Sequence, residues 1–278
     1  MENIKTIIAR FPEISRLEIE TIIAHVLRIS REAVLISPDR QLAPRQIGRI
    51  EKLIARRQSG EPLAYLTGHK EFYGLDFTVN RHVLVPRPET ELMIDEVLTL
   101  AKKVVPSAII DVGTGSGCIA ITLAKRLGSK IIAIDISKRA LATAQKNAEL
   151  NGVDGHLEFI HGSLLRPLLE TGRLSRDARL VISANLPYLT PAQIAASPSI
   201  RHEPYLALES GTDGLRHYRQ LFKQIKDAGL SDFVILCEID DTQGAAMRDL
   251  IAIELPQTRF EIKQDLGHYD RLAIIHSN

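Results

Sequence analysis

The first seventy residues show the hydrophobic spacing of amphipathic helices. One stretch repeats apolar side chains at i, i+3, i+4 and i+7: Ile19, Ile22, Ile23 and Val26. Ser15 and Glu18 precede it in the spacing of a capping box, which predicts where the helix begins. A later helix is predicted from Pro44, because proline suits the first helical turn. Its apolar stripe is Ile47, Ile50 and Ile54. Short helices with one apolar face must pack together, so this region predicts a small bundle.

The pattern changes after this region. Residues 72–86 are rich in aromatic and β-branched side chains on both sides of a polar break at Asn80-Arg81-His82. Such a pattern predicts a β-hairpin whose turn is the polar break. Pro86 and Pro88 then end the hairpin and mark a boundary.

From residue 89 onward, short apolar runs alternate with helical patterns. The runs lie at 107–112, 130–136, 156–161, 179–184 and 232–239, and a closing pair lies at 259–265 and 271–276. Repeated strand–helix units predict a parallel sheet covered by helices on both faces. The closing pair has no helix between its members, so it must be antiparallel. The predicted fold is α/β, a doubly wound sheet that is mostly parallel with an antiparallel last strand, preceded by a small helical domain and a β-hairpin. The predicted parts are 1–71, 72–88 and 89–278.

Composition limits the class of protein. The 278 residues are 45% hydrophobic and 25% charged, as in a globular protein, and the net charge of +1 gives no overall attraction to nucleic acid or anionic membrane. The two cysteines form no Cys-x-x-Cys pair and the histidines show no zinc spacing, so no metal site is predicted. The chain shows no signal-peptide pattern and no membrane span, and we therefore expect a cytoplasmic protein.

The first candidate for chemistry is a glycine loop between a predicted strand and helix. It reads Gly113-Thr114-Gly115-Ser116-Gly117, directly after Asp111-Val112. Glycines allow a tight turn and close approach to a ligand, and Asp135, at the end of the next strand, can accept both ribose hydroxyls. The spacing differs from the dinucleotide pattern G-x-G-x-x-G and from the phosphate-binding loop. It favours a nucleoside with a positive charge, and S-adenosylmethionine fits. The alternative is an ordinary strand-to-helix turn with a solvated Asp135.

The second candidate follows the predicted strand at 179–184 and reads Asn185-Leu186-Pro187-Tyr188. It lies at the carboxyl end of a strand, where open α/β sheets bind ligands. The Asn185 side chain and the Leu186 carbonyl offer two acceptors, Pro187 stiffens the turn, and Tyr188 offers a flat face. Two acceptors suit the two hydrogens of an amide or aromatic amino group. The alternative is an ordinary turn, since Asn and Pro are common turn formers.

Together these motifs resemble the amino-methylating branch of the class I methyltransferases. More narrowly, the chain resembles the release factor glutamine methyltransferases, and the resemblance covers nearly its whole length. It is carried by Gly60-Glu-Pro-Leu-Ala-Tyr-Leu-Thr-Gly68, Phe72-Tyr-Gly-Leu-Asp-Phe77, Pro86-Arg-Pro-Glu-Thr-Glu91, His202-Glu-Pro204, Leu206-Ala-Leu-Glu-Ser-Gly211 and Asp265-Leu-Gly-His-Tyr-Asp-Arg271.

The resemblance implies methyl transfer from S-adenosylmethionine to the side-chain nitrogen of the glutamine in the Gly-Gly-Gln motif of peptide-chain release factors. It implies that the N-terminal domain helps to grip the release factor. We also expect a monomer that makes no membrane contact and meets nucleic acid only through the ribosome. The implied cofactor-binding residues are Gly113, Thr114, Gly115, Ser116, Gly117, Asp135, Ser163, Leu164 and Asn185. The implied substrate-binding residues are Asn185, Leu186, Pro187 and Tyr188, of which Asn185, Pro187 and Tyr188 are the catalytic set.

The chain departs from the family pattern at two positions. Leu186 stands where the family commonly has a proline, and we expect activity to survive because the backbone carbonyl is the part that acts. Ser163 stands where an Asp commonly meets the adenine amino group, which puts the tightness of cofactor binding in question.

Other functions fit parts of the sequence. Asn-Leu-Pro-Tyr also resembles the motif of ribosomal RNA dimethyladenosine enzymes, so adenine-N6 methylation of RNA or DNA is the alternative, which the near-zero net charge disfavours. A cofactor-binding protein without activity is disfavoured by the intact Asn185 and Tyr188. A basic stripe at helical spacing is either a solvated helix face or a contact for an acidic release-factor surface or ribosomal RNA: Arg45, Arg49, Lys52 and Arg56.

Overall fold

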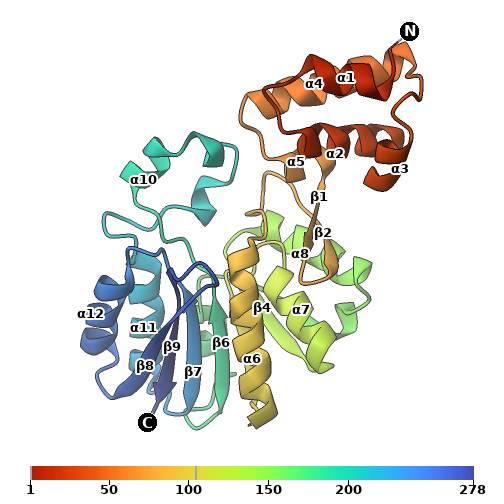
Figure 1. Cartoon of the computed structure of the whole chain (residues 1–278). Coiled ribbons are helices and arrows are strands. Elements are labelled where there is room, and N and C mark those ends of the chain that lie inside the picture. The colour runs from red at the N-terminus through yellow and green to blue at the C-terminus, as the bar shows by residue number, and fades with distance from the viewer. Residues whose placement is uncertain (1, 104) are drawn as a thin grey trace. The chain divides into compact units, whose positions relative to one another are not determined.

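The computed structural model describes residues 2–103 and 105–278, which fold as two compact units (Figure 1). One unit contains the N-terminal residues up to His69 together with Ser197–His202. The other contains Lys70–Ala196 and Glu203–Asn278. Nothing in the local sequence pattern indicates that residues 197–202 belong with the first unit. The boundaries expected at residues 71 and 88 stay predictions.

The N-terminal unit is helical, as its hydrophobic spacing predicts. Its helices are α1 (Ile4–Arg10), α2 (Arg16–Leu27), α3 (Arg31–Ile36), α4 (Pro44–Gln58) and α5 (Leu63–Thr67). The apolar stripe of α2 is buried, and Ile50 and Ile54 of α4 pack in the same core. Ser15 caps α2 by accepting from the Glu18 N–H at 3.3 Å. Among the described residues the reciprocal bond of a capping box is not found, and the Glu18 carboxylate accepts from Arg57 at 2.8 Å.

The basic stripe lies on α4. Arg56 forms an ion pair with Glu61, and its guanidinium donates to both carboxylate oxygens of Glu61. The other three members, Arg45, Arg49 and Lys52, are exposed. Both interpretations of the stripe stay predictions.

A β-hairpin follows, formed by β1 (His69–Phe72) and β2 (Leu75–Thr78). The hairpin is confirmed, but its predicted turn is wrong. The turn lies between residues 72 and 75, where two successive residues have positive φ of 51° and 76°. The polar break read as the turn lies beyond β2. There the Asn80 side chain donates to Thr143 at 3.1 Å, a contact between residues far apart in sequence.

The second unit is built on one seven-stranded sheet of order β5-β4-β3-β6-β7-β9-β8. The strands are β3 (Ala108–Val112), β4 (Ile131–Asp135), β5 (Leu157–His161), β6 (Leu180–Ala184), β7 (Phe233–Glu238), β8 (Thr258–Gln264) and β9 (Asp270–Ser277). The first five are parallel, whereas β9 pairs antiparallel with both β7 and β8. The predicted fold class is confirmed, and each predicted strand boundary lies within one residue of the observed one.

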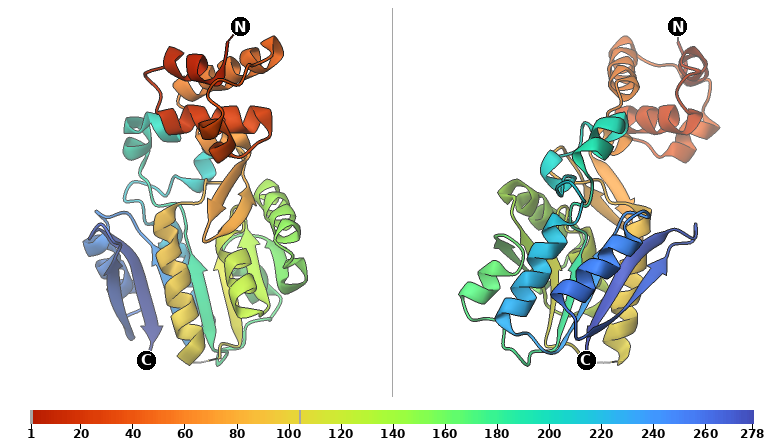
Figure 2. Two further views of the ribbon diagram at one scale, coloured as in Figure 1. Left: turned by 45° about the vertical axis from the view of Figure 1, so that its right-hand side comes forward. Right: turned by 90° about the vertical axis from the view of Figure 1, so that its left-hand side faces the viewer.

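Helices cover both faces of this sheet (Figures 1 and 2). One face is covered by α6 (Glu91–Lys103), α7 (Cys118–Leu127) and α8 (Lys138–Leu150), and the other by α9 (Arg166–Glu170), α11 (Arg216–Ala228) and α12 (Gly244–Glu254). The short helix α10 (Pro191–Ala196) and 3-10 turns at Pro88–Thr90, Asp154–His156, Pro198–Ile200 and Tyr205–Ala207 complete the described elements. None of the helices in the described part of the chain has the length and apolar character that a membrane span needs.

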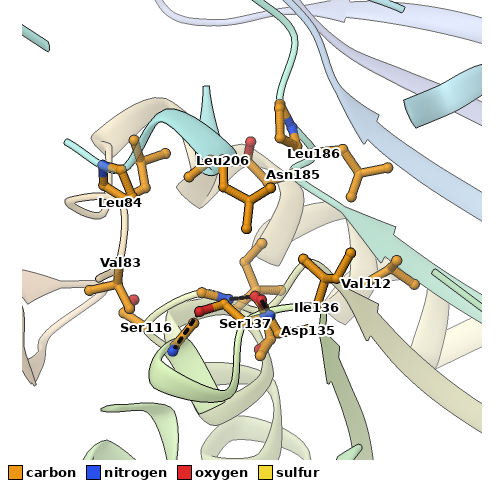
Figure 3. Close-up of a pocket in the computed structure, with 18 of the residues that line it drawn as sticks. Val83, Leu84, Val112, Ser116, Asp135, Ile136, Ser137, Asn185, Leu186 and Leu206 are labelled. Carbon is orange, nitrogen blue, oxygen red and sulfur yellow. Dashed lines mark hydrogen bonds between the residues drawn. The ribbon is translucent and has the colours of Figure 1, made fainter. Parts of the chain in front are cut away.

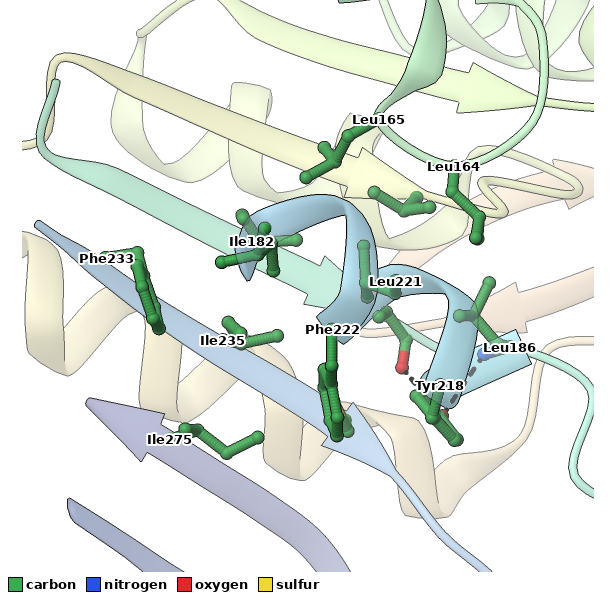
Figure 4. Packing of buried hydrophobic residues seen from close by; sticks show 14 of the residues in the cluster. Leu164, Leu165, Ile182, Leu186, Tyr218, Leu221, Phe222, Phe233, Ile235 and Ile275 are labelled. Atoms are coloured by element: carbon green, nitrogen blue, oxygen red, sulfur yellow. Dashed lines mark hydrogen bonds between the residues drawn. The ribbon is translucent and has the colours of Figure 1, made fainter. Parts of the chain in front are cut away.

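The main hydrophobic core lies between the sheet and α11 (Figure 4). Ile182 of β6 and Ile235 of β7 are fully buried against Leu221 and Phe222 of the helix. Strands covered on both faces need apolar side chains at nearly every position, which is why they appear as continuous apolar runs in the sequence.

Tyr218, near the start of α11, places a hydroxyl with three polar partners in this core. Its ring is fully buried. Its hydroxyl lies 3.0 Å from the carbonyl oxygen of Ala184 and also contacts the carbonyl oxygen of Glu238, and it accepts from the Leu186 N–H at 3.3 Å. One hydroxyl therefore holds together the carboxyl ends of β6 and β7 and the peptide that follows β6.

Tyr218→Phe should lower the free energy of unfolding of the protein by about 1–3 kcal/mol, because a buried N–H loses its acceptor while the ring still fills the core. Urea denaturation followed by circular dichroism measures the change. Tyr269→Phe is the matched control, since Tyr269 is 55% exposed. Equal stability of the Tyr218 variant and the wild type would contradict this role for the hydroxyl.

Candidate active site

The sheet order reverses between β3 and β6, which creates a crevice at the carboxyl ends of these strands. A cavity of about 240 Å³ lies there. It is lined by the glycine loop, by the residues that follow β4, β5 and β6, by segment 82–87, and by residues 204, 206 and 207. Figure 3 shows Asn185 and Leu186 on one side of this cavity and Asp135, Ile136 and Ser137 on another. The structure thus brings both predicted motifs to one cavity.

The glycine loop needs glycine at its first and last positions. Gly113 and Gly117 have positive φ of 75° and 83°. A Cβ atom on Gly113 would lie 2.9 Å from Leu186 Cδ2, and one on Gly117 would lie 2.7 Å from Ile121 Cδ1. Both distances are too short for real carbon contacts. The loop is therefore closely packed on both sides, which fixes the backbone that faces the cavity.

Asp111, at the carboxyl end of β3, binds the glycine loop through Thr114, outside the cavity. It is fully buried and is not among the residues that line the cavity. Its oxygens accept from the hydroxyls of Thr114 at 2.6 Å and Ser183 at 2.8 Å. Burial raises the pKa of the Asp111 carboxyl to about 6, although these two hydroxyls and the Ala120 N–H favour the charged form. Asp111 thus holds the loop in place rather than facing a ligand.

Asp135, at the end of β4, is the acidic residue that lines the cavity. One carboxylate oxygen accepts from the Gly115 N–H at 2.8 Å and the other from the Ser137 N–H at 2.7 Å. Burial raises its pKa, and these two N–H donors oppose the rise. Each oxygen of a carboxylate can accept about two hydrogen bonds, so one position on each oxygen remains. That geometry suits the two hydroxyls of a ribose.

The cavity next to Asp135 offers an apolar surface. Ile136 lines it and is 53% exposed, which leaves its side chain open to a flat ring. Ser163 and Leu164 line the same cavity. Leu164 has a φ of 55°, unusual for a non-glycine residue, and its buried side chain in the main core holds it there. Ser163 therefore reaches the cavity from a backbone that packing fixes.

The loop after β6 places two hydrogen-bond acceptors at the cavity. Asn185 and Leu186 line it, and the Asn185 Nδ2 donates to Thr90 Oγ1 at 3.1 Å. Within the described residues, no donor reaches Asn185 Oδ1 or the carbonyl oxygen of Leu186. Pro187 also lines the cavity. Tyr188 is not among the lining residues, and its hydroxyl donates to the Glu238 carboxyl at 3.4 Å.

Most residues expected at the site line the cavity: Gly113, Thr114, Gly115, Ser116, Asp135, Ser163, Leu164, Asn185, Leu186 and Pro187. Gly117 and Tyr188 are not among the lining residues. In the part of the chain that the structure describes, no group of three His, Cys, Asp or Glu side chains could hold a metal ion.

Sequence reasoning missed two buried polar residues that hydrogen bonds link to Asn185, one of which, Thr90, also lines the cavity. Thr90 and Glu238 are only 2% and 3% exposed, and the Thr90 hydroxyl donates to Glu238 at 2.6 Å. Thr90 belongs to the motif Pro86–Glu91. This motif supports the family resemblance, but the sequence assigns no function to its residues. Glu238 could have been found from the sequence, since it is an acidic residue at the end of the apolar strand β7.

Comparison with known proteins assigns the chain to a family. Residues 7–68 match the model of the PrmC N-terminal domain, and residues 109–200 match that of a methyltransferase domain. The release factor glutamine methyltransferase of Nitratidesulfovibrio vulgaris is 37% identical over 95% of this chain and 88% of its own length. That of Moorella thermoacetica is 38% identical over 99% of this chain and 96% of its own length. The chain belongs to the release factor glutamine methyltransferase family. Membership makes it an enzyme of the S-adenosylmethionine-dependent class, as the sequence resemblance implied.

Solved structures share the fold of this family member at low identity. The human Mettl16 catalytic domain in complex with the MAT2A 3'UTR hairpin 1 has a TM-score of 0.58 and 18% identity, covering 74% of this chain and 76% of that one. The human methyltransferase 10 domain containing protein has a TM-score of 0.54 and 18% identity, covering 74% and 89%. At such identity the likeness shows a common fold and gives no support to an RNA substrate.

Asp111→Asn should make protein stability less dependent on pH between about 4 and 7. The pKa of Asp111 rises from 3.8 to about 6 on folding, so the folded protein binds this proton more tightly than the unfolded chain. The free energy of unfolding of the wild type minus that of the variant should therefore fall by roughly 2–3 kcal/mol as the pH rises through this range.

Urea denaturation at pH 4, 5, 6 and 7 measures this difference. Asp154→Asn, at an exposed position, is the control and should give a flat difference. A flat difference for Asp111→Asn as well would show that Asp111 titrates alike in the folded and unfolded protein.

Proposed function

We propose that this family member transfers a methyl group from S-adenosylmethionine to the side-chain amide nitrogen of the glutamine in the Gly-Gly-Gln motif of peptide-chain release factors. The observation that carries the proposal is the pair of acceptors at the cavity, Asn185 Oδ1 and the Leu186 carbonyl oxygen, to which no described residue donates. The names of the relatives across most of the chain support the same substrate.

The residues of the cavity fit S-adenosylmethionine. Asp135 would accept the two ribose hydroxyls, and Ile136 would lie against the adenine ring. The loop Gly113–Gly117 would hold the methionine end, where its closely packed backbone approaches the ligand. Ser163 and Leu164 would lie at the adenine edge. Bound there, the cofactor supplies a methyl group on a positively charged sulfur.

The chain's contribution to the reaction is positioning. An amide nitrogen is a weak nucleophile, because resonance draws its lone pair toward the carbonyl group. Asn185 Oδ1 and the Leu186 carbonyl would each accept one hydrogen of the glutamine amide, which aims the lone pair at the methyl group. Orientation of this kind contributes several kcal/mol to the lowering of a barrier. Both acceptors would also stabilise the positive charge that grows on nitrogen.

Atoms and charge balance without a general base. The glutamine nitrogen would form the new N–C bond as the S–C bond of the cofactor breaks, with the electron pair of that bond left on sulfur. The methylated nitrogen is strongly acidic at this point and releases one proton to solvent, which restores a neutral amide. Tyr188, which faces Glu238, supports this loop from the side away from the cavity.

The N-terminal helical unit is the proposed contact for the release factor. It matches the family's own N-terminal domain over residues 7–68, which a general adenine methyltransferase does not require. This match favours a protein substrate over the alternative of adenine-N6 methylation on ribosomal RNA or DNA.

A labelled-methyl assay tests the substrate. The purified chain should transfer label from S-adenosylmethionine to a release factor and should fail to label a variant whose Gly-Gly-Gln glutamine is replaced by alanine. Ribosomal RNA should stay unlabelled. Label that persists on the glutamine-free factor, or that appears on the RNA, would contradict the proposal.

Asn185→Ala should lower kcat by about 100-fold or more, which is typical of the loss of one transition-state hydrogen bond, and should leave cofactor affinity nearly unchanged. Isothermal titration calorimetry measures the affinity, and the labelled-methyl assay measures kcat. Asn151→Ala is the control, because Asn151 lies after α8 and its side chain donates to a backbone carbonyl of β2. Loss of cofactor binding with unchanged turnover per bound cofactor would show that Asn185 serves the cofactor instead.

A further inference from the structure

We propose that Thr90 and Glu238 are positioning residues for methyl transfer, because they fix which end of the Asn185 side-chain amide faces the cavity. The inference rests on the proposed role of Asn185 as an acceptor for the substrate amide. It adds two residues to the site: Thr90, which lines the cavity, and Glu238, which is not among the lining residues.

The three side chains form one connected chain of hydrogen bonds. Asn185 Nδ2 donates to Thr90 Oγ1 at 3.1 Å, and Thr90 Oγ1 donates to Glu238 Oε2 at 2.6 Å. Tyr188 approaches the other carboxyl oxygen at 3.4 Å. The groups come from three places in the sequence: the 3-10 turn before α6, the loop after β6, and the end of β7. Thr90 and Glu238 are buried, so water does not compete for these bonds.

The direction of the hydrogen bonds follows from the number of hydrogens. A threonine hydroxyl has one hydrogen, and the 2.6 Å distance to Glu238 falls in the range of a hydroxyl bonded to a carboxylate. Once that hydrogen points at Glu238, Thr90 Oγ1 can only accept. It therefore selects the NH₂ end of Asn185 and repels the Oδ1 end. Asn185 Oδ1 is then the end of the amide that remains for a ligand in the cavity, which both Asn185 and Leu186 line.

The surroundings of Glu238 support this direction. Burial raises the pKa of its carboxyl, whereas the Thr90 hydroxyl, the positive charge of Arg271 and the Tyr188 hydroxyl favour the charged form. Glu89 is the acid that opposes them. Either a carboxylate or a carboxyl group protonated on the oxygen near Tyr188 keeps Oε2 as an acceptor for Thr90.

A reversed Asn185 would present its NH₂ group to the glutamine amide. Two donors would then face each other, and one hydrogen of the substrate would lose its acceptor. The nitrogen lone pair would no longer be held in line with the methyl group. The reversed form should therefore bind the cofactor normally but turn over slowly, since Asp135 and the glycine loop are untouched.

The first test compares three variants. Thr90→Val keeps the shape of the side chain and removes the hydroxyl, so kcat should fall about tenfold while cofactor affinity stays within about twofold. Thr90→Ser keeps the hydroxyl and should retain most of kcat. Thr122→Val is the matched control, because Thr122 is also fully buried but its hydroxyl has no hydrogen-bond partner among the described residues. It should leave kcat unchanged.

The second test changes Glu238. Glu238→Gln keeps a carbonyl oxygen for Thr90 and should retain more activity than Glu238→Leu, which leaves the Thr90 hydroxyl free to donate to Asn185 Oδ1. Calorimetry with S-adenosylmethionine and thermal melting are recorded for every variant. The expected result is a loss of kcat in the Leu variant with cofactor affinity maintained.

A double-variant cycle separates this inference from the proposed function. If Thr90 acts through Asn185, then Thr90→Val should cost nothing further in an Asn185→Ala background. Full additivity, equal losses in Thr90→Val and Thr90→Ser, or a wild-type kcat in Thr90→Val would overturn the positioning role. An active Asn185→Ala would instead overturn the proposed role of Asn185 itself.

Discussion

The hydroxyl of Tyr218 is the contact on which the geometry of this site depends. It lies where β6 and β7 end, and it contacts the carbonyl oxygens of Ala184 and Glu238. Beyond this point the two strands no longer share a ladder of hydrogen bonds. The same hydroxyl accepts from the Leu186 N–H, which sets the direction of the chain after β6. The acceptors that face the cavity are thus positioned by a group buried in the main core.

A second constraint is the burial of acidic residues at the carboxyl ends of three strands. Asp111, Asp135 and Glu238 end β3, β4 and β7 or lie one residue before the end, and burial raises the pKa of each. Each is stabilised by its own donors, which are hydroxyls for Asp111 and Glu238 and backbone N–H groups for Asp135. Of these three acids only Asp135 lines the cavity, so it is the one whose charge a ligand bound there would meet.

The parts of this structure that the sequence predicts are those with local causes. Strands buried on both faces need continuous apolar runs, and the glycine loop needs residues that tolerate positive φ, so both are visible in the sequence. The hairpin turn was misplaced because Asn80 looks like a turn residue, yet it bonds to Thr143. Thr90 and Glu238 lie 148 residues apart, and no local spacing could bring them together.

At position 186, a hydrogen bond and side-chain burial hold the backbone of a leucine in place. The resemblance to the family implies a proline here, which would stiffen the chain but has no N–H. Leucine restores the N–H, and that group donates to Tyr218. Its side chain is 4% exposed and belongs to the main core. A hydrogen bond and burial thus replace the rigidity of a ring. The proposed acceptor at this position is the backbone carbonyl, so the proposed chemistry needs only a fixed peptide, and leucine held in this way supplies one.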